Sequence, residues 1–139
     1  MSAFDTATKF FHACESLQGW EGCKPFTADG ARFEAQCEPL VDVTTVEDYT
    51  NWWAGLGSGP LVGCEYTLRS SAWDEANRTA LFFATVAVAH TGEGGPVPPT
   101  GLGGEADYAY AIRMDEHDRV AHMTKVWNAP WSMRALGWM

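Results

Sequence analysis

The sequence predicts an α+β domain in which early helices pack on the concave face of a strongly curved antiparallel or mixed β-sheet. The first observation is that two early segments, 5–18 and 46–56, repeat apolar residues every three to four positions. The second is that the chain beyond Cys64 changes to strand-forming runs separated by short polar turns. Helices that precede hairpin-linked strands are typical of α+β domains. A long, twisted sheet of this kind is expected to curl into a half-open cone.

The first predicted helix spans Asp5–Gln18, and Gly19 is a plausible residue to end it. A short helix or turn is expected over Trp20–Phe26. The apolar side of the first helix is formed by Phe4, Ala7, Phe10, Phe11, Cys14 and Leu17. Its opposite side carries His12, which we interpret as a surface histidine.

The second long helix is predicted to begin after a capping box made by Thr44 and Glu47. It continues through VEDYTNWWAGL and ends in the glycine-rich stretch before Pro60. Trp52 and Trp53 are adjacent, so we expect one to pack in the core and the other to lie at a cavity mouth or an interface.

The strands are expected at Ala31–Cys37 and in two hairpins. The hairpins pair 64–73 with 78–90, and 106–114 with 119–128 around the turn Asp115–Asp118. The intervening segment Thr91–Gly104 is too rich in glycine and proline for a regular element. It is not expected to bind a nucleotide phosphate, because such a loop must lead into a helix N-terminus and here a strand follows.

Composition limits the possible functions. The 139 residues fit one domain, 1–139, and 46% of them are apolar. A net charge of −9 argues against nucleic-acid and membrane partners. No basic leader with a long apolar run is present, which predicts a cytoplasmic protein. The four cysteines lack zinc-ligand spacing and are expected to be reduced core thiols, so no metal or cofactor is predicted.

The last predicted strand carries three polar candidates, His122, Lys125 and Asn128. Strand alternation places Lys125 on the face of Met123 and Trp127, and places His122 and Asn128 on the other face unless a bulge intervenes. A buried Lys125 could act as a base, form an imine or anchor an anion. Alternatively, it pairs with a carboxylate or reaches solvent.

The histidines leave two alternatives open. His122 could be a general base or a structural histidine, and His90, at a strand end beside the glycine-rich loop, could contact a ligand or cap the strand. Asp107 could serve as a base in a shifted register, or it could be solvated or face a dimer partner. His117 is interpreted as a turn residue.

Several motifs together carry a resemblance to a known family. They are His90 with the loop ending Pro98-Pro99-Thr100-Gly101, the Asp-Glu-His-Asp turn, and the tail VAHMTKVWNAPWSMRALGW with its terminal Leu-Gly. These motifs and the element order resemble the NTF2-like superfamily, and SnoaL-like proteins within it. The superfamily includes ketosteroid isomerases, polyketide cyclases, scytalone dehydratase and limonene epoxide hydrolase. The resemblance implies a cone-shaped α+β fold around a ligand cavity.

The family's catalytic positions match this chain only in part. The general-base aspartate of SnoaL-type cyclases falls at Asn128, and an amide cannot accept a proton at neutral pH. The base of the steroid isomerases falls at Ala35 or Gln36, and their phenol donor falls near Phe11. Their second donor falls at Tyr110, whose hydroxyl can still donate to a ligand oxygen.

The expected function is binding of a small hydrophobic molecule, polycyclic or aromatic, by a homodimer. As an enzyme, the protein would be an isomerase, cyclase or dehydratase that moves a proton next to a carbonyl. His122 or Lys125 would be the acid or base, and Tyr110 and Asn128 would polarise the oxygen. The alternative is a non-catalytic carrier, sensor or accessory protein with the same pocket. The expected ligand contacts are Phe11, Tyr49, Trp52, Trp53, His90, Tyr108, Met123 and Trp127.

Overall fold

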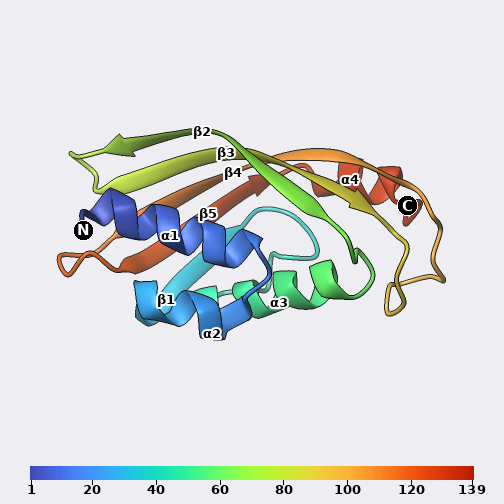
Figure 1. Cartoon of the computed structure of the whole chain (residues 1–139), viewed down its shortest axis with the longest axis horizontal. Helices are drawn as coiled ribbons and strands as arrows, with labels where there is room; N and C mark the ends of the chain where they lie inside the picture. The colour runs from blue at the N-terminus through green and yellow to red at the C-terminus, as the bar shows by residue number, and fades with distance from the viewer.

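The computed structural model describes all residues, 1–139, as one curved sheet with helices on its inner side (Figure 1). The helices are α1 (Ala3–Glu15), α2 (Gly19–Cys23), the 3₁₀ turn η1 (Lys24–Phe26), α3 (Val46–Ser58) and α4 (Ala129–Ala135). The strands are β1 (Thr27–Ala35), β2 (Glu65–Asp74), β3 (Thr79–Ala89), β4 (Gly103–Met114) and β5 (Val120–Trp127).

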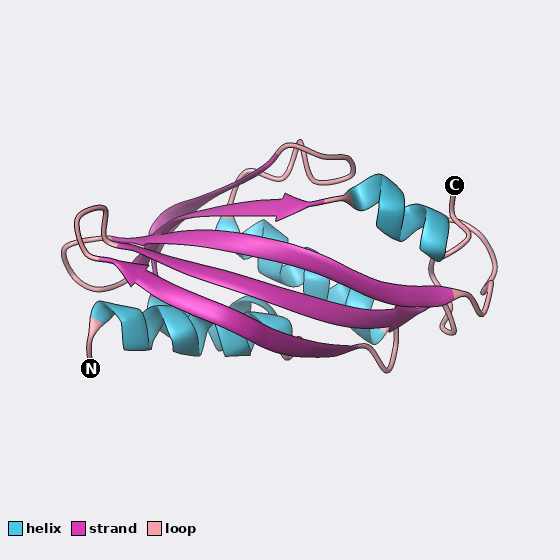
Figure 2. Ribbon diagram, turned by 90° about the horizontal axis from the view of Figure 1, so that it is seen from above, coloured by secondary structure: helices cyan, strands magenta, loops and turns pink.

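The strands form one mixed sheet in the order β1-β5-β4-β3-β2. The four later strands pair antiparallel as successive neighbours, whereas β1 pairs parallel with β5. The sheet bends over α1 and α3, and seen from above α4 lies beyond the end of β5 (Figure 2). The predicted α+β class with a strongly curved mixed sheet is therefore confirmed.

Both long helices begin at capped N-termini. In α1, the Ser2 hydroxyl accepts from the Asp5 amide and the Asp5 carboxylate accepts from the Ser2 amide. In α3 the cap is Thr45, not Thr44, since its hydroxyl accepts from the Asp48 amide. The predicted capping box was one residue early because the helix begins at Val46, so the N-cap is Thr45, which is extended and within reach of that amide.

Other boundaries also differ from the predictions. Helix α1 spans Ala3–Glu15 rather than Asp5–Gln18, and Gly19 begins α2 instead of ending α1. Strand β1 begins at Thr27 rather than Ala31, because Gly30 adopts a left-handed conformation and the pairing with β5 shifts register there. The helix α4 was not predicted in the C-terminal tail. It forms because the Asn128 side chain accepts from the Trp131 amide and Pro130 fits the first turn.

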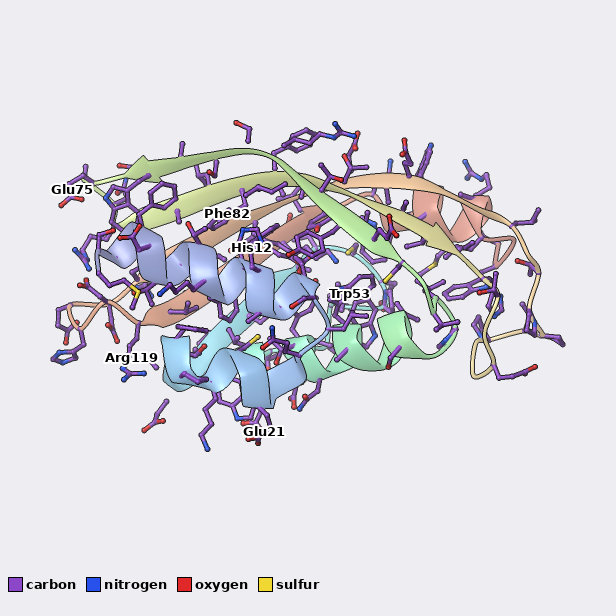
Figure 3. The ribbon with its side chains drawn as sticks, viewed as in Figure 1. His12, Glu21, Trp53, Glu75, Phe82 and Arg119 are labelled. Carbon is purple, nitrogen blue, oxygen red and sulfur yellow. The ribbon has the colours of Figure 1, made fainter.

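The inner side of the sheet is filled at one end by aromatic packing. Phe11 of α1 stacks on Phe82 of β3 with ring centroids 4.8 Å apart, and Phe4 stacks on Trp73. Phe82 and Trp53 lie toward different ends of this inner layer (Figure 3). None of the helices combines the length and the apolar composition that a membrane span requires.

Candidate functional site

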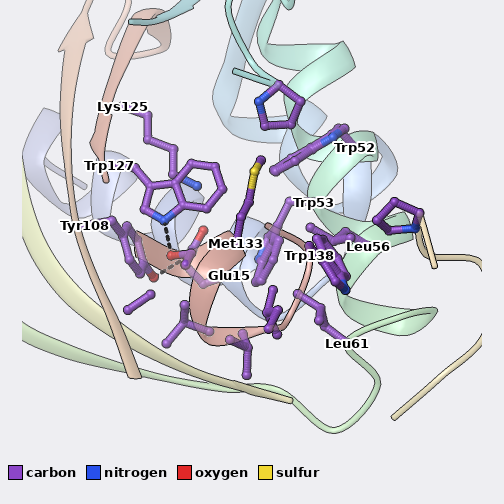
Figure 4. A pocket seen from close by; sticks show the side chains of 17 residues that line it. Glu15, Trp52, Trp53, Leu56, Leu61, Tyr108, Lys125, Trp127, Met133 and Trp138 are labelled. Atoms are coloured by element: carbon purple, nitrogen blue, oxygen red, sulfur yellow. Dashed lines mark hydrogen bonds between the residues drawn. The ribbon is translucent and has the colours of Figure 1, made fainter. Parts of the chain in front are cut away.

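A cavity of about 370 Å³ lies between the sheet, α3 and α4 (Figure 4). Most of its wall is apolar and aromatic, which suits a small organic ligand. Its lining comes from every layer of the fold: Glu15, Pro39, Trp52, Trp53, Leu56, Leu61, Val86, Val88, Pro96, Ala106, Tyr108, Lys125, Trp127, Ser132, Met133, Leu136 and Trp138.

Two oppositely ionising groups, Glu15 and Lys125, share this wall. Glu15 is 4% exposed and stands in the last turn of α1, four residues after Phe11. Lys125 is 7% exposed and projects from β5 between Met123 and Trp127, as the strand alternation predicts. The two groups form no direct ion pair. A carboxyl and an amine are thus presented separately to one apolar space.

Three tyrosines join the two groups by hydrogen bonds. The Lys125 Nζ donates to the Tyr49 hydroxyl at 3.0 Å, and the Tyr49 and Tyr110 hydroxyls are 2.6 Å apart. Tyr110 in turn donates to Glu15 Oε2 at 2.8 Å, and Tyr108 donates to Glu15 Oε1. Because Lys125 donates at one end and Glu15 accepts at the other, Tyr49 must donate to Tyr110 when both ends are ionised.

Aromatic rings surround the Lys125 ammonium on several sides. Its Nζ lies 4.6 Å from the Trp127 ring centroid and 5.2 Å from that of Tyr49. Four further rings, those of Trp52, Trp53, Tyr108 and Tyr110, lie within 5.9 Å. The ring faces offset part of the cost of removing the ammonium from water.

Burial moves the pKa values of both groups toward neutrality. Desolvation raises the pKa of Glu15, although the bonds from the tyrosines and the charge of Lys125 oppose that rise. Desolvation lowers the pKa of Lys125 from 10.5 to about 8, against the opposing effect of Glu15. Burial also raises the pKa values of Tyr49, Tyr108 and Tyr110, which keeps the phenols protonated. Protons can therefore be gained or lost at Glu15 and Lys125 rather than at the tyrosines.

The structure brings four of the eight predicted ligand-contact residues to the cavity wall. Tyr108, Trp52, Trp53 and Trp127 line it directly, Trp53 being buried and Trp52 half-buried. Tyr49 and Tyr110 lie behind the wall, fully buried, and reach the cavity only through Lys125 and Glu15. Three other predicted ligand contacts do not line the cavity: Phe11, Met123 and His90.

Each of these three has a packing role instead. Phe11 lies in the filled end of the inner layer, against Phe82, and Met123 is fully buried. His90 is buried beside the glycine-rich loop, where its Nδ1 accepts from the Trp138 indole at 2.8 Å. Since Trp138 lines the cavity, His90 holds a wall residue in place without lying on the wall itself.

Two predicted catalytic residues, His122 and Asn128, do not reach the cavity. The alternation of β5 points His122 to the outer face, where Nε2 lies 3.4 Å from a Glu34 oxygen. Asn128 is exposed beyond the end of β5 and caps α4. No bulge between Met123 and Trp127 moves them inward, since that stretch pairs regularly with β4.

Glu15 is the functional candidate that the sequence interpretation missed. The signal for it was present, because Ala7, Phe11 and Glu15 recur every four residues and so share one face of α1. Both hydrophobic members of that series are fully buried, and the glutamate continues the same face. His, Cys, Asp and Glu side chains do not gather anywhere in groups of three or more that could hold a metal ion.

Comparison with known proteins gives matches in structure alone. No protein-family model and no curated protein sequence matches the chain. A protein from Jannaschia sp. CCS1, described as a candidate SnoaL-like polyketide cyclase, superposes with a TM-score of 0.77 at 16% identity, over 96% of this chain and 90% of its own. IdmH from Streptomyces antibioticus, a candidate polyketide cyclase, gives 0.75 at 15% identity, over 99% of both chains.

An NTF2-like protein from Burkholderia thailandensis E264 gives a TM-score of 0.71 at 14% identity, over 94% of this chain and 93% of its own. These likenesses extend over nearly the whole length of each chain, and they include the sheet and the helices that enclose the cavity. The chain therefore has the NTF2-like fold, in a form close to that of SnoaL-like proteins.

Proposed function

We propose that the protein binds a small, largely hydrophobic carbonyl compound in its cavity and moves a proton at the carbon next to the carbonyl. The reaction class would be an isomerisation, cyclisation or dehydration. The observation that carries this proposal is the presence of Glu15 and Lys125, separately held, on the wall of one mainly apolar cavity. The description of proteins with similar folds as candidate polyketide cyclases is consistent with it.

In the proposed reaction Glu15 removes the proton. A carboxylate becomes a stronger base as its pKa rises, and burial raises the pKa of Glu15. The Lys125 ammonium, hydrogen-bonded to Tyr49, would stabilise the negative charge that develops on the carbonyl oxygen. The apolar lining would hold the flat part of the ligand and exclude water.

The test uses 2-acetylnaphthalene, an aromatic methyl ketone. Binding is followed by tryptophan fluorescence, which is sensitive here because four of the seven tryptophans line the cavity. Proton transfer is followed by NMR as exchange of the methyl protons for deuterium in D₂O. We expect Glu15→Gln to slow this exchange about 100-fold or more while binding persists. His122→Ala, on the outer face, is the matched control and should leave both signals unchanged.

A second candidate, a non-catalytic carrier, sensor or accessory protein, is favoured by a different observation. Glu15 and Lys125 both have internal hydrogen-bond partners, so each side chain is held in place without a ligand. Fluorescence quenching without any protein-dependent deuterium exchange, across aromatic and steroid-like ketones, would support this alternative. Absence of quenching by all of them would contradict both candidates.

We also propose that the outer face of the sheet forms a homodimer interface. Leu81, Phe83 and Val126 are 47%, 43% and 67% exposed, and the strand register places Ala109 beside both Phe83 and Val126. Charged residues of both signs, including Arg32, Glu34, Asp107 and Arg113, lie on the same face and would suit a self-complementary rim. Light scattering should give twice the mass of 15.2 kDa, and Phe83→Glu should return the protein to a monomer.

The compartment that we propose is the cytoplasm. All four cysteines are free, and Cys14 and Cys23 are buried, as expected for a reducing environment. Titration of unfolded protein from a cytoplasmic fraction with a thiol reagent should find four free thiols.

A further inference from the structure

We propose that Lys125 forms a covalent imine with an aldehyde or ketone bound in the cavity. This inference rests on the proposed function, since it concerns the same ligand class and the same cavity. It goes further by assigning a bond between the protein and its ligand. It also narrows the ligand to carbonyl compounds whose carbon an amine can attack, which excludes carboxylic acids.

The first argument is that the Lys125 amine is available. An amine held tightly by a carboxylate stays protonated and cannot act as a nucleophile. Glu15, the carboxylate that shares the cavity wall, is instead held by Tyr108 and Tyr110. The only hydrogen bond of the Lys125 Nζ goes to the Tyr49 hydroxyl. The neutral phenol oxygen carries no negative charge that would hold the third proton on Nζ.

The second argument is the environment that the aromatic rings create. Six rings surround Nζ, the nearest being that of Trp127 with its centroid 4.6 Å away. An imine is hydrolysed by water, so a wall of rings that limits water prolongs its life. The same ring faces attract a cation, and they would favour the positively charged iminium over the neutral carbonyl compound.

The third argument concerns the proton balance at working pH. The pKa of Lys125, lowered to about 8 by burial, leaves roughly a quarter of the amine unprotonated at pH 7.5. An ordinary exposed lysine has about 0.1% in that form. Enough Lys125 is therefore unprotonated at this pH to react with a carbonyl compound bound beside it.

The chemistry balances with groups that the cavity supplies. The neutral amine attacks the carbonyl carbon to form a C–N bond, and the oxygen takes up the proton that the nitrogen loses. The resulting carbinolamine loses its hydroxyl as water when the Glu15 carboxyl donates a proton, and the C=N bond forms as the C–O bond breaks. The iminium acidifies the neighbouring C–H bond, from which the Glu15 carboxylate removes a proton. The Glu15 carboxyl returns a proton to carbon of the resulting enamine, which restores the iminium. Hydrolysis with one water then releases the carbonyl compound and the amine.

The experiment traps the imine by reduction. The protein is incubated at pH 7.5 with 2-naphthaldehyde and sodium cyanoborohydride, and the modified residues are identified by peptide mass mapping. The chain has only three lysines, and Lys9 and Lys24 are exposed. The N-terminal amine is the internal reference, because Met1 is exposed and lies outside the cavity.

We expect modification of Lys125 at least tenfold faster than that of the N-terminal amine. An excess of 2-naphthalenemethanol, an alcohol of similar shape that has no carbonyl, should suppress labelling of Lys125 alone. Lys125→Met should lose the fast reaction, whereas Lys24→Met should keep it. Labelling of Lys125 no faster than that of the N-terminal amine, or insensitive to the alcohol, would overturn the proposal. The alcohol competition is made on the wild-type protein, so it decides the matter even if Lys125→Met fails to fold.

The result is separable from the test of the proposed function. Deuterium exchange that depends on Glu15 but occurs without trapping would leave the proton-transfer function standing and remove the covalent step. Trapping at Lys125 without exchange would retain the covalent step and show that Glu15 does not act as the base.

Discussion

The inner side of the sheet has two halves that the same elements build and that differ in what they enclose. In the packed half, Phe11 of α1 and Phe82 of β3 stack face to face and leave no space. In the cavity half, one turn further along α1, Glu15 faces an opening lined by tryptophans. Helix, strands and curvature are shared, so the difference lies in the side chains alone.

The inward residues of the sheet become smaller toward the cavity end. Inward positions of β3 pass from Phe82 to Ala84 and Val86, and those of β4 pass from Tyr110 and Tyr108 to Ala106. Small side chains on the sheet cannot meet the helices across the layer, and a hollow results. One sheet thus holds a filled half beside a hollow half, and four predictions test this difference.

The largest difference is expected in stability. Phe82→Ala should lower the free energy of unfolding by about 3–5 kcal/mol, because it opens a void in a filled layer. Trp127→Ala should cost less than half as much, because its ring already borders a cavity. Urea unfolding measures both, with the exposed Val62→Ala as a control that should stay within about 0.5 kcal/mol. Equal losses in the two halves would contradict the comparison.

The next prediction concerns the buried amine of the cavity half. The pKa of Lys125 is about 8 in the folded protein against 10.5 in its ordinary state, so between these values the unfolded chain binds more protons. Stability that depends on Lys125 is therefore lowest below pH 8 and rises up to about pH 10.5, by about 3 kcal/mol in total.

Urea unfolding at pH 7.5 and pH 10 should show this rise as the difference between the wild type and Lys125→Met. The tyrosines and cysteines that titrate in the same range are present in both proteins, and their contributions largely cancel in the difference. A difference that does not change with pH would mean that Lys125 keeps an ordinary pKa in the folded protein.

A smaller effect should separate two neighbouring tyrosines. Tyr110→Phe should destabilise the protein by about 2 kcal/mol, because it removes two buried hydrogen bonds at once, one from Tyr49 and one to Glu15 Oε2. Tyr108→Phe should cost about 1 kcal/mol or less, since Tyr108 and Glu15 both line the cavity, where water can replace the lost bond. Thermal unfolding of the two variants shows which substitution destabilises the protein more. A larger loss for Tyr108→Phe would mean that the hydrogen bond beside the cavity contributes more than the two inside the wall.

The smallest stability change is expected on the outer face. Phe83→Ser should alter the unfolding free energy of the monomer by no more than about 0.5 kcal/mol, because the side chain is already 43% exposed. The same change should weaken the proposed dimer. Sedimentation at several concentrations checks the association, and dilute urea unfolding checks the monomer. A large loss in the monomer would show that Phe83 supports the inner layer.

Much of the fold follows from local spacing. Period-two alternation correctly predicts that Lys125 lies on the same face as Met123 and Trp127, because β5 pairs regularly with β4 there. The hairpin turn at Asp115–Asp118 and the helix ends follow from turn and capping chemistry within a few residues, and the capping error at Thr45 was one position.

The candidate site is only partly predictable in this way. The sequence placed Lys125, Tyr108 and three tryptophans in a ligand site, and the structure brings these five to the cavity wall. It also suggested Asn128, which instead caps α4 because the chain turns into a helix there. Counting residues can match a position of this chain to a catalytic position of the family. Whether the side chain at that position points into the cavity depends on where the strand ends.

By itself the sequence determined the order of helices and strands as far as β5, and the faces that their side chains share, since both depend on neighbours within a turn or two. Only the tertiary structure decided that Glu15 and Tyr110 meet across 95 residues of chain, and that one half of the inner layer is hollow. Such contacts depend on whether side chains from distant segments fill the space between them. No periodicity along the chain encodes that fit.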